Sequence, residues 1–82
     1  MTNEQKISIF IKMLHAELMM EKEQTAIARA RKHNREYSIQ EHTKNYNWWN
    51  TYTEGIFDVL LVMGIADEYD NWAIGKNSLD AL

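Results

Sequence analysis

The sequence contains no cysteine and no proline, and it has only three glycines among its 82 residues. The lack of cysteine excludes disulfide bonds and thiolate metal sites. The lack of proline and the scarcity of glycine leave few points at which a helix has to stop. A chain of this length is close to the smallest size at which one hydrophobic core is sufficient. Without covalent cross-links, such chains often gain burial from a partner or from a second copy.

Long apolar runs are missing as well. No segment approaches the roughly 18 apolar residues that a membrane-spanning helix requires. The first five residues, MTNEQ, are mostly polar and lack the basic and then apolar order of a signal peptide. We therefore expect a soluble, cytoplasmic protein that has no membrane partner.

The net charge is only −3, but the charges are unevenly distributed. Residues 1–53 carry eight Lys and Arg against six Asp and Glu, whereas residues 54–82 carry one against six. Such an asymmetry can steer a partner or orient two copies of the chain. Nucleic-acid-binding domains are usually basic overall, so we expect no nucleic-acid partner.

A basic cluster nevertheless lies near two tryptophans, and it has two interpretations. Cations beside the aromatic rings of Trp48 and Trp49 could bind phosphates and stack bases. The favoured alternative is that the cluster complements the negative end of a helix dipole. Its members are Arg29, Arg31, Lys32, His33, Arg35 and, on the next segment, Lys44.

Apolar residues at spacings of three and four predict a long helix over residues 3–33. Thr2 and Gln5 have the capping-box pattern that opens a helix. Asn34 is suited to the left-handed position that follows a helix end. The apolar stripe of this helix is expected to consist of Ile7, Phe10, Ile11, Leu14 and Leu18.

A second helix is predicted over residues 39–63, after a second capping box at Ser38 and Glu41. Gly64 followed by Ile65 is typical of a Schellman stop. Asp67 is then expected to cap a short third helix over residues 67–74, and residues 76–82 are expected to fray. The second helix carries a heptad formed by Ile39, His42, Tyr46, Trp49, Thr53, Ile56, Leu60 and Met63.

Two long helices joined by a short turn predict an all-α fold, a long antiparallel helical hairpin plus a short C-terminal helix, in a single domain. We expect the alanine-rich end of the first helix to face aromatic residues, with Ala26 and Ala28 opposite Tyr46 and Trp48. At the open end, Leu14 and Leu18 are expected opposite Ile56 and Leu60. Pairing of two hairpins into a four-helix-bundle-like homodimer would cover the apolar residues that the hairpin leaves exposed. The alternative is a compact three-helix monomer in which the third helix covers them.

Aromatic and arginine side chains dominate the energetics of protein interfaces, and this sequence groups them. Trp48 and Trp49 are adjacent, so they cannot both face the hairpin seam; if Trp49 does, then Trp48 points to an interface. The alternative is that the alanine-rich end of the first helix buries both. The interface candidates are Trp48, Trp49, Tyr52, Phe57, Leu61, Arg31 and Arg35.

Four acidic residues form the sharpest candidate for a metal site. Glu17 and Glu21 are one helical turn apart, and so are Glu54 and Asp58. The hairpin is expected to bring the two pairs to one level, and Mg²⁺ and Mn²⁺ prefer such oxygen ligands. The alternative is that all four are solvated charges, some of them paired with lysines at helical spacing.

The run EGIFDVLL at residues 54–61 resembles the Glu-x-x-x-Asp helix of the all-α, MazG-like nucleotide pyrophosphohydrolases. The resemblance implies that four acidic groups on two helices hold Mg²⁺, which positions a nucleoside triphosphate for attack by water. Glu54 and Asp58 match one half of the family pattern. The other half is Glu-Glu-x-x-Glu, whereas Glu17 and Glu21 are spaced by four without a doubled acid.

No other constellation indicates catalysis. The three histidines share no metal-ligand spacing, and the sequence has neither a glycine-rich phosphate loop nor a recognisable nucleophile–base pair. We therefore predict a small, non-enzymatic protein–protein interaction module without a cofactor, which binds and modulates another macromolecule. It resembles accessory proteins of phages and mobile elements, including inhibitors of host defence nucleases. The alternative is a reduced, Mg²⁺-dependent MazG-like nucleoside triphosphate pyrophosphohydrolase.

Overall fold

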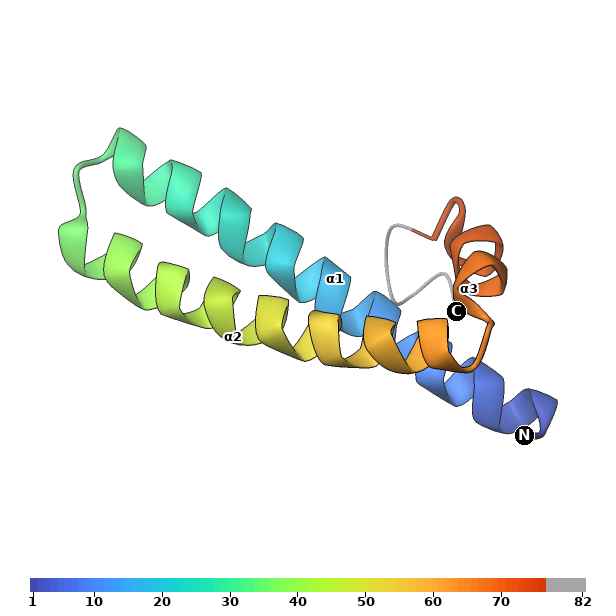
Figure 1. Ribbon diagram of the computed structural model, residues 1–82. Coiled ribbons are helices and arrows are strands. Elements are labelled where there is room, and N and C mark those ends of the chain that lie inside the picture. The colour runs from blue at the N-terminus through green and yellow to red at the C-terminus, as the bar shows by residue number, and fades with distance from the viewer. Residues whose placement is uncertain (77–82) are drawn as a thin grey trace.

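The computed structural model describes residues 1–76, which form three α-helices (Figure 1). Helix α1 spans Asn3–Lys32, α2 spans Glu36–Val62 and α3 spans Ala66–Ala73. The first two form a long antiparallel hairpin, and α3 lies at its open end, near the N-terminal half of α1. This arrangement confirms the all-α prediction of a helical hairpin followed by a short helix. Residues 77–82, which make up most of the segment predicted to fray, lie outside the described residues.

The helix ends follow from short-range chemistry. At the start of α1, the Gln5 N–H donates to Thr2 Oγ1 at 3.1 Å, and the Thr2 N–H donates to Gln5 Oε1 at 2.9 Å. Asn34 follows α1 with φ 54°, and Gly64 follows α2 with φ 71°. In both turns the next residue closes the Schellman hydrogen bond, from Arg35 to Ala30 at 2.9 Å and from Ile65 to Leu60 at 3.0 Å. The capping box at Thr2 and both helix stops are confirmed.

Two predicted caps are wrong. Helix α2 begins at Glu36 rather than near residue 39, with Arg35 as its N-cap and no side-chain cap, so the Ser38–Glu41 capping box does not form. The Schellman turn at Asn34 already redirects the chain, which allows the helix to restart at once. Helix α3 begins after Ile65, and Asp67 lies inside its first turn instead of capping it. A carboxylate there still interacts favourably with the helix dipole.

Helix α1 contacts α2 along a stripe with alternating spacings of four and three, the repeat of a coiled-coil seam. All residues of this stripe are buried or half-buried. The Thr53 hydroxyl on α2 lies 3.5 Å from the sulfur of Met20, which places this stripe against the α2 heptad. The residues of the α2 heptad are buried or half-buried as well, except Met63, which is exposed. The α1 stripe consists of Ile9, Met13, Ala16, Met20, Glu23, Ile27 and Ala30.

The stripe predicted for α1 has a different role. Phe10 and Leu14 are buried in a core cluster at the open end of the hairpin, together with Met13, Leu60 and Tyr69. The α1 helix therefore buries two neighbouring faces, one against α2 and one against α3. Ile11, by contrast, is exposed.

The predicted pairing of Ala28 with Trp48 is wrong. Trp48 packs on aromatic rings of its own helix, and both residues are exposed. The alanines that the fold buries most deeply are Ala16, with none of its surface exposed, and Ala30. The alanines packed into the seam are therefore Ala16 and Ala30 and not Ala28.

Helix α3 is held on α1 by aromatic packing and two polar contacts. The ring centroids of Tyr69 and Trp72 lie 5.5 and 5.6 Å from that of Phe10. The Tyr69 hydroxyl donates a hydrogen bond to the carboxylate of Glu17, and Lys6 Nζ lies 2.7 Å from Glu68 Oε2. Burial, the hydrogen bond to Glu17 and the negative charge of Glu17 raise the pKa of the Tyr69 phenol well above its ordinary value of 10.0.

We predict that Ala16→Leu lowers the free energy of unfolding by about 1–3 kcal/mol, because the extra carbons have no space in the seam. Urea unfolding followed by far-UV circular dichroism measures this. The matched control is Ala28→Leu on the same helix, whose side chain is exposed and which should change stability little. Equal losses in both variants would contradict this seam.

The Tyr69 phenol should make the free energy of unfolding depend on pH in the alkaline range. Its pKa is raised in the folded state, so its contribution is complete below the unfolded value of 10.0 and is lost as the pH rises above it. We expect the free energy of unfolding of the wild-type chain to fall more steeply between about pH 10 and about pH 11 than that of Tyr69→Phe. Denaturant titrations of both proteins across this range test it, and parallel slopes would be inconsistent with a buried phenol.

Candidate interaction surface

The four acidic residues do not form a metal site. Glu17 accepts the hydrogen bond of Tyr69 from α3, and Glu54 accepts one from Asn50 at 3.2 Å on its own helix. Glu17, Glu21, Glu54 and Asp58 are all exposed. Within residues 1–76, no three His, Cys, Asp or Glu side chains are grouped so that they could hold a metal ion. The expected convergence is therefore wrong, because the α2 heptad turns Glu54 and Asp58 away from α1.

A different acidic residue is buried. Glu23 is only 8% exposed, and its Oε2 lies 2.6 Å from Nδ1 of His42 on α2. Sequence reasoning placed His42 in the seam but missed Glu23. The available signal was its position, seven residues after Ala16 and seven before Ala30, in the repeat that faces α2. The pair joins the two long helices through a polar contact inside an otherwise apolar stripe.

An aromatic surface lies on α2, which we define as Trp48, Trp49 and Tyr52. The rings of Trp48 and Tyr52 are stacked, with centroids 5.5 Å apart and an interplanar angle of 10°. Trp49 packs edge-on against Trp48 at 4.7 Å and against His15 of α1 at 5.4 Å. Trp49 is half-buried in the seam, while Trp48 is 59% exposed and Tyr52 is 38% exposed. The structure thus brings together three of the seven interface candidates.

The other four candidates lie elsewhere. Phe57 and Leu61 are one turn apart and exposed, on the side of α2 opposite to Trp48 and Tyr52. Arg31 and Arg35 are exposed at the turn of the hairpin. A single interface of all seven residues is therefore not what the fold presents.

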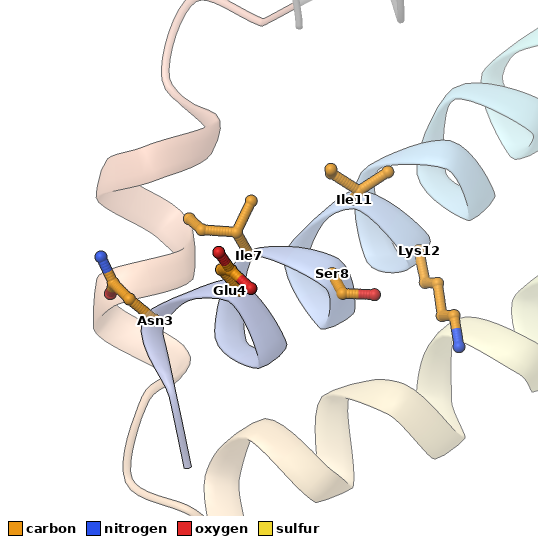
Figure 2. A pocket seen from close by; sticks show the side chains of 6 residues that line it. All are labelled: Asn3, Glu4, Ile7, Ser8, Ile11 and Lys12. Atoms are coloured by element: carbon orange, nitrogen blue, oxygen red, sulfur yellow. The ribbon is translucent and has the colours of Figure 1, made fainter.

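Shallow hollows lie on the hairpin, and two of them concern the aromatic surface and the N-terminal end of α1. One adjoins the aromatic surface and is lined by Lys44, Asn47, Trp48, Thr51 and Tyr52. Figure 2 shows the other, near the N-terminal end of α1, where Ile7 and Ile11 supply the apolar part. Its remaining lining residues are Asn3, Glu4, Ser8 and Lys12.

No helix within residues 1–76 is long and apolar enough to cross a membrane. Comparisons with protein-family models, with curated proteins and with solved structures found no match.

The Glu23–His42 pair makes a testable contribution to stability. His42→Leu should lower the free energy of unfolding by about 1–3 kcal/mol, because it leaves a buried carboxylate without a partner. The double variant Glu23→Leu/His42→Leu should recover most of this loss, since apolar residues can replace both members of a buried pair. Chemical denaturation of the wild-type chain, both single variants and the double variant gives a double-mutant cycle for the pair. A double variant as unstable as His42→Leu would mean that packing, and not the pair, matters at this level.

Proposed function

We propose that this chain is a small, non-enzymatic protein–protein interaction module, which forms a homodimer and binds and modulates another macromolecule. The observation that carries this proposal is the aromatic surface, a tryptophan and a tyrosine stacked and exposed on a long helix. The chain would belong with the accessory proteins of phages and mobile elements, for example as an inhibitor of a host defence nuclease. This class is an analogy at the level of size and fold.

The aromatic surface is suited to binding. Trp and Tyr are enriched among the residues that dominate interface energies. Stacking of Trp48 on Tyr52 already restricts both side chains, so less conformational entropy is lost when a partner covers them. Helix α2 holds both rings at fixed positions, which is more favourable than presenting them on a loop.

The C-terminal half of α2 adds exposed apolar surface beyond these rings. Monomeric soluble proteins rarely expose large contiguous apolar patches, and such patches mark interaction sites. Exposed residues occur on more than one side of the helix, so one partner cannot cover them all. A second copy on one side and a target on another is consistent with this distribution. The residues are Phe57, Val59, Leu61, Val62 and, at the C-cap, Met63.

A module of this type acts by occupying a surface of its target. The uneven charges of the chain would orient it during the encounter, since basic residues cluster at the turn and acidic residues at the open end. Binding would then block or reposition the target without any chemical step. Inhibition of an enzyme is the simplest outcome of such binding.

Photo-crosslinking in the cells that naturally produce the protein tests this function. A photoreactive phenylalanine analogue replaces Leu61 in one variant and Trp48 in another, and exposed Glu21 on α1 in the control. We expect a discrete adduct heavier than two copies of the 9.7 kDa chain from at least one of the two α2 positions. The Glu21 variant should give none, and excess unlabelled chain should abolish the adduct.

The masses of the adducts separate the two parts of the proposal. Adducts of two chains alone, at both α2 positions, would mean self-association without a target and would reject the modulator function. No adduct at either position would reject the interaction module as a whole.

A further inference from the structure

Helix α2 carries a second apolar repeat, which α1 does not cover. Its members are spaced by four, three, four and three residues, the spacing of a coiled-coil seam. Every one of them is exposed, up to 88% for Val62. None is charged. We define the outer stripe as Trp48, Tyr52, Gly55, Val59 and Val62.

Gly55 lies at the centre of this stripe and inside α2, where glycine is among the least favourable residues. Apart from its chain neighbours and the adjoining backbone of its own helix, no atom lies within 4 Å of the position that a Cβ would occupy there. The fold of one chain therefore gives no reason for a glycine at this point. A second helix that approaches closely would give one, because the missing side chain allows two backbones to come together.

The exposed area is consistent with a missing partner. The chain exposes 5955 Å², whereas a folded monomer of its mass typically exposes about 5100 Å². Its radius of gyration is 14.8 Å, against about 12 Å for a compact chain of this length. The excess area, roughly 850 Å², is close to what each partner contributes to an interface of standard size, about 800 Å².

Charge favours a second copy in the antiparallel orientation. The turn half of the hairpin, residues 20–50, has six Lys and Arg against four Asp and Glu. The open half, residues 1–19 and 51–76, has three against seven. Antiparallel packing places the basic half of one copy beside the acidic half of the other, whereas parallel packing would place like charges together.

We propose that a second copy of this chain covers the outer stripe, with the two α2 helices antiparallel about a two-fold axis near Gly55. The proposal rests on the interaction function above and names the partner of the aromatic surface. In this arrangement Trp48 faces Val62 of the second copy, and Tyr52 faces Val59. Large side chains thus meet small ones, and glycine meets glycine at the point of closest approach, as interdigitated packing requires.

The arrangement leaves a separate surface for the target. Phe57 and Leu61 lie on the opposite side of α2, so the dimer would not bury them. The dimer would therefore present two copies of this second surface, related by the same axis. A bound target could engage one or both.

Cysteine crosslinking tests the position of the axis, and the absence of native cysteine makes single variants unambiguous. Gly55→Cys should form a disulfide-linked dimer rapidly under mild oxidation, because a disulfide needs Cα atoms closer than about 7 Å. Val62→Cys should crosslink slowly, since antiparallel packing separates the two copies of this residue. Glu54→Cys, adjacent but off the stripe, measures random collision.

Two outcomes of the crosslinking rates would contradict the proposal. Rapid crosslinking of both Gly55→Cys and Val62→Cys would indicate parallel packing and overturn the antiparallel axis. Equal rates for Gly55→Cys and Glu54→Cys would overturn the interface itself. Neither result would bear on whether a different protein binds at Phe57 and Leu61, which the photo-crosslinking experiment decides.

A second measurement does not depend on a substitution at Gly55. Light scattering on the purified wild-type chain should give twice its mass, and Val59→Glu should give a monomer with unchanged helicity. The matched control is Leu61→Glu, which places the same charge on an exposed apolar position off the stripe and should remain dimeric. A monomeric wild-type chain, or dissociation by both substitutions alike, would overturn the proposal.

Discussion

The packing of α1 against α2 along one narrow seam is the constraint on which the rest of the structure depends. A seam between two helices buries one stripe of each, so most of the surface of both remains outside it. Helix α1 gains a second buried face because α3 folds back onto Phe10 and Leu14. Helix α2 gains none of comparable extent. The exposed aromatic and aliphatic residues of α2 are thus a direct result of a fold with too few helices to cover them.

Sequence reasoning predicted those features that depend on neighbouring residues. The cap at Thr2 and the turns at Asn34 and Gly64 each involve groups within five positions along the chain. The start of α2 was wrong because the Schellman turn at Asn34 competes with the capping box at Ser38, and local rules do not rank the two. Glu23 was missed for another reason. Its burial depends on which helix covers it, and that is a property of the tertiary arrangement.

The candidate site likewise has features that the sequence predicts and features that depend on the tertiary arrangement. The aromatic residues could be selected from the sequence, since Trp48 and Trp49 cannot share one face of a helix. The grouping of all seven candidates could not be tested without the fold, which separates Leu61 from Trp48 by half a turn of the helix. The acidic residues show the same limit more strongly. Their spacing along each helix was correct, but a metal site depends on the relative rotation of two helices, which spacing does not determine.

The distribution of buried residues along the hairpin has a consequence for its dynamics. At the open end, Phe10, Leu60 and Tyr69 join all three helices, whereas near the turn Ala30 is the buried apolar residue. Local opening should therefore begin at the turn, and backbone amides there should exchange with solvent faster than those beside Leu60. The segments that meet at the open end are also the most distant in sequence, so their association closes the largest loop. The contacts expected to persist longest are thus also those that close the largest loop, whereas the turn joins neighbouring segments and has few buried contacts.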